Sequence, residues 1–348
     1  MSANIRETRF CMGVHKQAAL QTPLEAADMI SLYKTNPSLF QVDLRTESNA
    51  GWIGKNDEFP TQNFLTSWDA SGALEGYLSS EKAALLLSYA HGKSTATPLS
   101  AGAISYAIEP LDPVTEEIEM PSTTFVEAIR QGASSVIDRA LVGMCCEEVA
   151  VDINSGPGLQ GARITSQWVG CGKTVEPSTI TVPAITAEHL LPAYSATLSV
   201  IGMDYVTAGK IATAHYGWKN NIRLDTGYYP GSGSSDGAQV RGRMEHGDRA
   251  VSFSAVARYA SDSTELAKLK AQTEGTVVLT LTGALIAPGI YHSLTITLQR
   301  VVIRTAQISD TDGIVTVAVE VEPLTHSVNG LVDITVVTAT DEIMEAAA

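Results

Sequence analysis

Two stretches of this sequence share one order, in which an alternating apolar run leads into a short helical segment and then into a second alternating run. In the first stretch, residues 64–74 predict a strand and residues 82–90 a helix rich in Ala and Leu. Ser79 is a good N-cap for that helix, and Gly92 is typical of a helix end. Alternation over residues 104–108 then predicts a half-buried strand.

The second stretch repeats this order. Residues 250–259 alternate as a strand, and Asp262 and Glu265 have the spacing of a capping box at the start of a helix. Gly275 ends that helix, and residues 277–281 alternate again. We interpret the match as a duplication of one strand–helix–strand module. Chance similarity between two such pieces is the alternative.

Most of the remaining sequence also predicts strands. Residues 33–63 are the exception, because they are polar and contain several Gly and Pro residues; they predict a long loop or an open hairpin. A turn at residues 154–158 predicts a hairpin, and residues 341–348 predict a short helical or frayed tail. The other predicted strands are residues 149–153, 164–169, 294–303, 314–321 and 331–337.

Composition limits the classes of function open to the chain. Of its 348 residues, 44% are hydrophobic, which is enough for real cores, and only 18% are charged. The formal net charge of −15 disfavours tight binding to nucleic-acid phosphates. The N-terminal residues contain no apolar run, and no stretch approaches the ~20 apolar residues that span a bilayer. We therefore expect a soluble protein that is made in the cytoplasm and has no membrane partner.

Motifs for nucleotides, catalysis and metals are weak. Residues 156–161 match GxGxxG, but an alternating strand follows where a nucleotide site needs a helix. Residues 172–174 resemble the end of a phosphate loop that lacks its first glycine, and residues 233–237 match GxSxG only within a polar loop. The four cysteines show neither disulfide nor metal spacing, and no histidines pair as HxH or HxxxH. We expect no enzyme activity, no cofactor, no metal, and cysteines that are small buried side chains.

Several segments of the chain resemble siphophage major tail tube proteins. They are residues 9–24, residues 58–71 with the helix that ends at Gly92, residues 145–153 with 158–172, and residues 249–283. The resemblance implies a mainly β fold of two β-sandwich or barrel modules, each with a flanking short α-helix. In this family the modules join edge to edge and form a continuous inner β-barrel on assembly, which leaves no free sheet edge.

The repeat and the resemblance together predict the domain organisation. The first module is expected over residues 1–140, with the long loop at 33–63, and the second over residues 141–348; the boundaries are approximate and the modules can interleave. Rings of this family contain six modules. Two modules per chain therefore predict a trimer with pseudo-sixfold symmetry, as in the duplicated T5-like tail tubes, whereas a single elaborated module predicts a homohexamer.

The function that the resemblance implies is structural. Stacked rings would polymerise into the hollow tail tube of the virion, the conduit for the tape-measure protein and for DNA ejection. Tail terminator and baseplate or tip proteins would bind at the ends. The acidic balance suits a lumen through which DNA passes without specific binding. Another all-β virion protein, such as a tail terminator, neck or decoration module, is the alternative.

A family without an active site supplies no catalytic residue, so the candidate residues are contacts. Residues 33–63 and 227–240 are expected to reach neighbouring rings, and deletion of residues 36–58 to weaken polymerisation while leaving the fold intact. A basic cluster of three arginines around His246 predicts an inter-subunit ion-pair site or a contact with an acidic partner; a solvated strand edge is the alternative. The candidate inter-ring or inter-subunit contacts are Trp52, Lys55, Asp57, Glu58, Tyr229, Arg241, Arg243 and Arg249.

Overall fold

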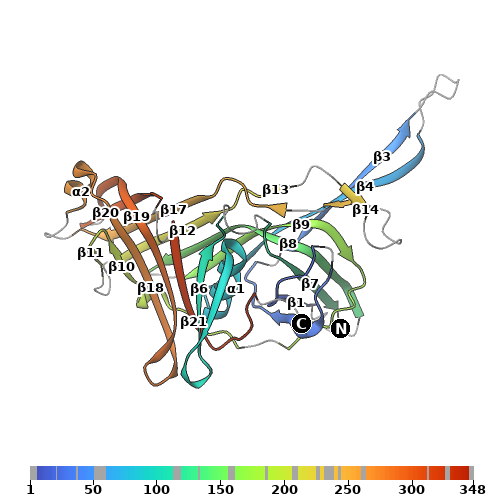
Figure 1. Cartoon of the computed structure of the whole chain (residues 1–348), viewed down its shortest axis with the longest axis horizontal. Helices are drawn as coiled ribbons and strands as arrows, with labels where there is room; N and C mark the ends of the chain where they lie inside the picture. The colour runs from blue at the N-terminus through green and yellow to red at the C-terminus, as the bar shows by residue number, and fades with distance from the viewer. Residues whose placement is uncertain are drawn as a thin grey trace.

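A computed structural model gives the structure of the chain (Figure 1). The residues that it describes are 6–20, 22–36, 38–50, 60–112, 119–131, 134–155, 161–184, 187–205, 211–224, 228–230, 239–241, 244–259, 264–311, 313–325 and 330–344.

Strands dominate these residues, which confirms the mainly β fold. We call β1 to β9 with helix α1 the first half, and β10 to β21 with helix α2 the second half. The first half contains β1 (Arg6–Gly13), β2 (Met29–Ser31), β3 (Gln41–Ala50), β4 (Pro60–Tyr77), α1 (Ser80–His91), β5 (Gly92–Pro98), β6 (Ile104–Pro110), β7 (Ser122–Gln131), β8 (Ser134–Asn154) and β9 (Arg163–Val175). The second half contains β10 (Thr197–Val200), β11 (Met203–Asp204), β12 (Ile211–Lys219), β13 (Arg223–Leu224), β14 (Tyr228–Pro230), β15 (Gln239–Arg241), β16 (Met244–Glu245), β17 (Ala250–Arg258), α2 (Glu265–Ala271), β18 (Gly275–Ala287), β19 (Ile290–Thr311), β20 (Ile314–Pro323) and β21 (Val332–Thr338).

One antiparallel pairing order occurs in both halves. In the first half the strands follow one another across the sheet as β3–β4–β9–β8–β7–β1–β2. In the second half the order is β12–β17–β20–β19–β18–β10–β11, also antiparallel throughout. Helix α1 follows β4 and helix α2 follows β17, so the two helices occupy equivalent places in the chain.

A pair of backbone hydrogen bonds follows the same correspondence. The N–H of Leu32, just after β2, donates to the carbonyl oxygen of Phe10 over 3.2 Å. The N–H of Tyr205, just after β11, donates to the carbonyl oxygen of Leu198 over 2.7 Å. Phe10 lies in β1 and Leu198 in β10, and both side chains are buried. The match therefore extends from strand order to single residues.

Two extended seams join the halves into one sheet, in addition to a single pairing of β15 with β4. β12 pairs with the C-terminal part of β8, and β21 pairs with β6. The sheet is continuous across both seams and, over the residues described, does not close on itself; the molecule is elongated (Figure 1). The β3–β4 hairpin projects from one end, while α2 and the β19–β20 hairpin lie at the other.

Helix α1 is a core helix, which corrects the expectation that it flanks the sheet. Ser79 caps it by accepting a hydrogen bond from the N–H of Lys82 over 3.2 Å, and Gly92 ends it in the left-handed region at φ 93°. Every one of its residues is buried. The apolar residues of α1 fill the core, and the buried polar side chains near its two ends have partners within the protein, such as Glu188 for Lys82 and Tyr216 for His91. In α2 only Glu265 is buried, so that helix does lie on the flank.

The segment predicted as a long loop is largely a hairpin. β3 and β4 pair from Gln41 with Ser71 to Ala50 with Pro60, so the open-hairpin alternative is the correct one. Phe40, just before β3, is 2% exposed and packs against the rings of Phe10 and Phe125. Deletion of residues 36–58 would remove this core side chain and could impair folding itself. A deletion that retains Phe40 is needed to test the role of the hairpin in assembly.

Further details of the sequence prediction can be compared with the structure. All four cysteines are free and buried, which confirms their interpretation as small core side chains; burial raises the pKa of the Cys171 thiol to about 11. The hairpin between residues 149–153 and 164–169 is confirmed by the β8–β9 pairing. After β21 the described residues, up to Met344, form no helix. Ile343 and Met344 pack into the core.

Candidate functional site: the junction of the two halves

The β8–β12 seam is the most extensive contact between the halves. It pairs residues 148–154 of β8 with residues 213–219 of β12. His215 and Asp152 lie directly opposite each other, with Nδ1 and Oδ1 2.7 Å apart, and this hydrogen bond raises the pKa of His215. Lys219 and Glu148 are also opposite, at 3.9 Å. The side chains of both pairs are exposed to solvent. They help to fix the register of β8 against β12 and add little to the stability of the fold.

The C-terminal end of α1 is held by residues of the second half. The last carbonyl groups of a helix have no partner within the helix. The carbonyl oxygen of Ala90 accepts hydrogen bonds from Nδ2 of Asn220 at 2.7 Å and from Nε1 of Trp218 at 3.1 Å. Asn220 also donates to the carbonyl oxygen of Cys146 in β8 at 3.0 Å. One buried amide thereby links the helix, β8 and the end of β12.

His91, the last residue of α1, continues this contact. Its Nδ1–H donates to the carbonyl oxygen of Leu87 over 2.9 Å, which leaves Nε2 as the acceptor for the hydroxyl of Tyr216 at 2.8 Å. The tautomer follows from these partners, because a carbonyl oxygen can only accept. Burial lowers the pKa of His91 to about 3, with the nearby charge of Arg249 acting in the same direction.

The N-terminal end of α1 is covered by the segment that leads into β10. The N–H of Ser80 donates to the carbonyl oxygen of His189 over 3.0 Å, and the N–H of Leu191 donates to that of Leu78 over 2.9 Å. Lys82, which is 1% exposed, forms a 2.6 Å ion pair with Glu188. A buried lysine requires such a partner, so this ion pair holds the segment against the helix.

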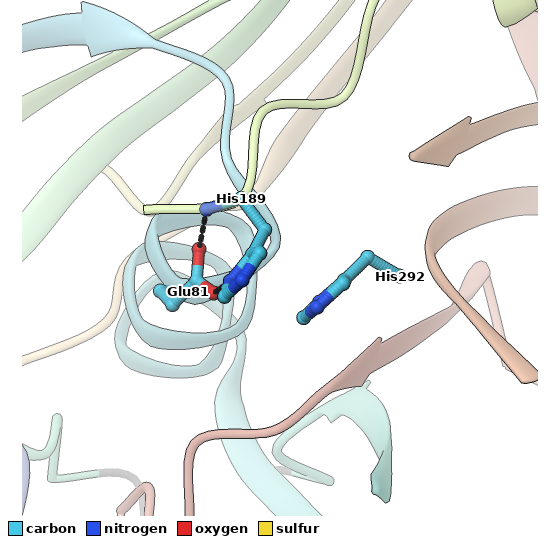
Figure 2. A group of neighbouring side chains, drawn as sticks. All are labelled: Glu81, His189 and His292. Atoms are coloured by element: carbon cyan, nitrogen blue, oxygen red, sulfur yellow. Dashed lines mark hydrogen bonds and ion pairs between the residues drawn. The ribbon is translucent and has the colours of Figure 1, made fainter. Parts of the chain in front are cut away.

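Glu81, His189 and His292 meet at the same place (Figure 2). The carboxylate of Glu81 accepts from the backbone N–H of His189 at 2.9 Å and lies 2.7 Å from its Nδ1. The rings of His189 and His292 stack with centroids 4.0 Å apart and planes 12° apart. Nδ1 of His292 contacts the hydroxyl of Ser80 at 2.8 Å. Burial and then the neighbouring His189 lower the pKa of His292, while Glu81 opposes the shift.

These three side chains are also the group that could offer ligands to a metal ion, since their ligand atoms lie within 4.8 Å of one another. An imidazole binds a metal in its own ring plane at ~2.0–2.1 Å. Two stacked rings with nearly parallel planes cannot both satisfy that condition for one ion. Both Nδ1 atoms are in addition engaged in hydrogen bonds. The arrangement is a hydrogen-bonded stack that ties the halves together, and metal binding would require it to open.

Several strands have an edge without a partner within the described residues, including β2, β5, β11 and β14. Two further open edges, in β3 and β19, correspond to the seam between the halves. β3 pairs only with β4, so its other edge is open. In β19, residues 302–311 pair with β20 on one side and with nothing on the other. β19 is the counterpart of β8, and residues 148–154 of β8 use the corresponding edge to bind β12. β12 is in turn the counterpart of β3. The open edges of β3 and β19 therefore match the two sides of the seam that is filled within the chain.

The candidate contact residues fall into distinct places. Trp52, Lys55, Asp57, Glu58 and Arg243 lie outside the described residues. Tyr229 is in β14 and Arg241 is in β15, which pair with each other, and β15 also meets β4 at Ser67. The structure thus brings β14 and β15 beside the β3–β4 hairpin.

Arg249 is half-buried and contacts a different part of the chain. Its Nη1 donates to the carbonyl oxygen of Leu111 at 2.6 Å, and its guanidinium lies 5.8 Å from the ring centre of Trp218. Sequence reasoning missed Asn220, His189 and His292 as contacts, because their partners are more than 100 positions away in the chain. Only the place of Glu81 in the first turn of a helix could be predicted.

Comparison with known proteins identifies a family. A family model described as phage tail tube protein matches residues 44–323, which is most of the chain and includes the β8–β12 seam and α1. No curated protein matches the sequence. In the described part of the chain, no helix has the length and apolar character needed to cross a bilayer.

Proposed function

Because the chain belongs to the phage tail tube protein family, and is thereby a structural component of the virion tail, we propose that it polymerises as stacked rings into the hollow tube. The tube would be the conduit for the tape-measure protein and for DNA during ejection. Tail terminator and baseplate or tip proteins would bind its ends.

The observation that carries the proposal is the pair of open edges at opposite ends of the molecule. Within the chain, β12 of the second half pairs with β8 of the first. In the ring, β3 of one copy would pair with residues 302–311 of β19 in the next copy, as β12 pairs with β8 within the chain. Such a head-to-tail contact generates a closed ring when its rotation closes, and it removes the free edges of β3 and β19. Figure 1 shows β3 and β19 at opposite ends, as head-to-tail contact requires.

We propose that the repeated pairing order marks two modules, at residues 6–175 and 197–338. The boundary expected at 140/141 falls within β8 (Ser134–Asn154), so the strand order supports a later division. With six modules per ring, as the family resemblance implies, three chains would form a ring with pseudo-sixfold symmetry. A homohexamer remains the alternative stoichiometry. The net charge of −15 supports a lumen that repels DNA and lets it pass.

A shortened hairpin tests the proposal. Val42 and Ala70 lie directly opposite each other, so replacing residues 43–69 with Asn-Gly gives a two-residue turn and keeps Phe40 in the core. We expect this variant to fold as a monomer and to form no tubes. Unmodified protein should give hollow tubes by negative-stain microscopy, and rings of three chains by native mass spectrometry. Tubes of normal length from the shortened variant would contradict the edge pairing, and six-chain rings would contradict the trimer.

A further inference from the structure

We infer that Asp310 of one copy forms an ion pair with Lys34 of the neighbouring copy, beside an apolar contact between Ile308 and Phe40. The inference rests on the proposed ring, and it adds the register of the contact and the charges that select the partner. That partner is a second copy of this chain. The surface that it covers is the exposed face of Ile308, Asp310 and Val315, which we call the hairpin-end face.

A matching bulge aligns β8 with β19 residue by residue. β8 bulges against β9 just after Cys146, and β19 bulges against β20 just after Ile303. Cys146 therefore corresponds to Ile303, and the two strands can be compared by counting onward from these residues. The corresponding pairs are Val149 and Ala306, Val151 and Ile308, and Ile153 and Asp310.

Equivalent hydrogen bonds give the same alignment. The N–H of Leu78, just after β4, donates to the carbonyl oxygen of Ala162 over 3.0 Å. The N–H of Tyr259, just after β17, donates to the carbonyl oxygen of Val315 over 2.9 Å. Ala162 and Val315 lie the same number of residues before the partners of the two bulges. Leu78 therefore corresponds to Tyr259, and β4 to β17.

β3 and β12 are then aligned through their partners. Val42 lies opposite Ala70, and Trp218 lies opposite Val251. Ala70 and Val251 lie equally far before the two residues that donate these hydrogen bonds, so they correspond to each other. The corresponding pairs of β3 and β12 are Val42 and Trp218, and Phe40 and Tyr216. The last two are both buried aromatic residues, which supports the alignment.

The β8–β12 seam supplies the register between copies. The opposite pairs in the seam are Trp218 with Val149, Tyr216 with Val151, and Ala214 with Ile153. Replacing each residue by its counterpart gives the contact of β3 with β19 in the ring. The opposite pairs between copies are then Val42 with Ala306, Phe40 with Ile308, and Ser38 with Asp310.

The backbone of Phe40 is already bonded within the chain. Its N–H donates to Oε1 of Glu127 over 3.0 Å, and its carbonyl oxygen accepts from Nη2 of Arg139. Backbone pairing between copies is therefore expected from Gln41 onward, along β3. At Phe40 and Ser38 only side chains meet the neighbour.

The hairpin-end face is uncovered within the described residues. Asp310 lies directly opposite Val315 in β20, and alternation along β19 puts Ile308 on the same face. Ile308 and Val315 are 45% and 39% exposed, while their counterparts Val151 and Ala162 are 0% and 4% exposed. The first half thus has a cover at this place that a neighbouring copy would provide for the second half.

Lys34 lies beside the place where Asp310 meets the neighbour. Its ammonium group donates to the carbonyl oxygen of Ser38, and it lies 5.5 Å and 5.0 Å from the ring centres of Phe10 and Phe40. A pocket of about 320 Å³, lined by Lys34 and Ser38 among others, opens at this point. The pocket leaves room for a carboxylate next to the ammonium group.

The charge of Lys34 is only partly compensated within its own chain. Burial lowers the pKa of Lys34, and the carboxylates of Glu127 and Glu75 oppose the shift without cancelling it. Glu127 is also engaged with Arg139, in an ion pair of 2.9 Å. A carboxylate from a neighbour would therefore stabilise the charged form of Lys34.

Asp310 in turn requires a cation once a neighbour covers it. In the β8–β12 seam, its counterpart Ile153 and the opposite Ala214 are both buried, so water is excluded there. A carboxylate at such a position loses its hydration, and pairing with an opposite charge offsets this cost. The seam within the chain is thus apolar at this point and the contact between copies is ionic. The ion pair also selects the partner, because an apolar strand would leave Asp310 unpaired.

A disulfide between copies tests the register. Gln41 and Gln307 are exposed, and they lie opposite each other in the proposed contact. Directly opposite antiparallel residues have Cα atoms ~4.5–5.5 Å apart, within the range that a disulfide spans. Tubes of Gln41→Cys/Gln307→Cys, oxidised with copper phenanthroline, should show covalently linked chains on non-reducing gels. Gln41→Cys/Ser309→Cys, displaced along β19, is the matched control and should stay unlinked; the four native cysteines are buried and should not react.

A suppressor variant tests the ion pair. Lys34→Met leaves Asp310 of the neighbour without its cation, and should raise the protein concentration needed for tube formation several-fold. Lys34→Met/Asp310→Ile copies the isoleucine of the β8–β12 seam and should restore assembly. Lys34→Met/Asp248→Ile changes a fully exposed aspartate elsewhere and should not restore it. Asp310→Lys, at an exposed position, should keep the unfolding midpoint of the unassembled chain and weaken assembly as Lys34→Met does.

Three results would overturn this inference and leave the ring intact. They are tubes in which Gln41→Cys/Gln307→Cys links no more than its control, a Lys34→Met defect that Asp310→Ile does not relieve, and Asp310→Lys tubes that form at the normal concentration. Failure of the unmodified protein to form rings would overturn the proposed function as well.

Discussion

Nδ2 of Asn220 donates a hydrogen bond of 2.7 Å to the carbonyl oxygen of Ala90, so a residue just after β12 completes the C-terminal end of α1. The same amide reaches the carbonyl oxygen of Cys146 in β8. Asn220 is 1% exposed, so water cannot replace these bonds. The core helix of the first half therefore depends on the second half for its hydrogen bonding, and the two halves should unfold together.

Substitution of Asn220 should lower the stability of the whole chain. Asn220→Ala leaves the carbonyl oxygen of Cys146 without this donor and removes one of the two donors to Ala90, which costs about 1–3 kcal/mol for buried groups. Asn220→Asp keeps an acceptor for Trp218 but places a carboxylate against two carbonyl oxygens, so it should cost at least as much. Urea unfolding of the unassembled protein measures both.

The exposed Gln307→Ala in β19 is the control and should change the unfolding free energy by less than about 0.5 kcal/mol. A separate early unfolding transition for one half in Asn220→Ala would show that the halves are independent. Wild-type stability in Asn220→Asp would show that the donated hydrogen bonds contribute little.

His91 should make the protein less stable in acid. Unfolded, its pKa is near 6.5, and in the folded protein burial holds the pKa near 3. Between these values the unfolded state binds more protons, so the free energy of unfolding falls as the pH drops through this window. His292, whose pKa is also lowered, acts in the same direction. His91→Gln should flatten the pH dependence measured by urea unfolding between pH 6.5 and pH 4.

His215 offers a control of opposite sign. The hydrogen bond with Asp152 raises the pKa of His215 in the folded protein. The stability that protonated His215 contributes is therefore fully present below its pKa in the unfolded state, and is lost as the pH rises through its pKa in the folded state. His215→Gln should therefore steepen the loss of stability in acid. An unchanged pH profile for His91→Gln would show that this histidine does not titrate on unfolding as its burial implies.

Zinc should not stabilise the protein through Glu81, His189 and His292. Binding would require the two stacked rings to separate and the hydrogen bonds of their Nδ1 atoms to break. We expect the thermal midpoint to stay within experimental error when Zn²⁺ is added in several-fold excess. A rise that is seen in the wild type and lost in both His189→Ala and His292→Ala would instead identify a metal centre.

Gly143 should be among the least replaceable residues of β8. It lies at the bulge between Val142 and Met144, with φ 71°. A Cβ there would come within 2.4 Å of the carbonyl oxygen of Leu20 and 2.5 Å of Sγ of Cys171. Gly143→Ala therefore combines backbone strain with a clash against backbone, and should destabilise the protein by several kcal/mol or prevent folding.

Gly313→Ala separates the two effects. Gly313 has φ 76°, and no atom lies within 4 Å of the position of an added methyl group. Gly313→Ala should therefore lower the free energy of unfolding only by the cost of the left-handed backbone, about 1–2 kcal/mol. The difference between the two variants in thermal unfolding gives the contribution of the clash. Equal midpoints would mean that β8 adjusts at the bulge without cost.

The sequence by itself determined the local elements and their order. Alternation over residues 250–259 and over 277–281 predicted strands, and Ser79 and Gly92 predicted the limits of α1, because side-chain periodicity and caps act over a few residues. The repeated strand–helix–strand order was visible for the same reason. The polar β3–β4 hairpin was less clear, since its strands lack the apolar face by which alternation is recognised.

Only the tertiary structure decided which elements meet. The pairing of β12 with β8, the amide of Asn220 on Ala90, and the stack of His189 on His292 join residues far apart in the chain. It also placed α1 in the core, where the second half covers it. Such contacts depend on the total surface that several elements bury together, and no window of neighbouring residues contains that information.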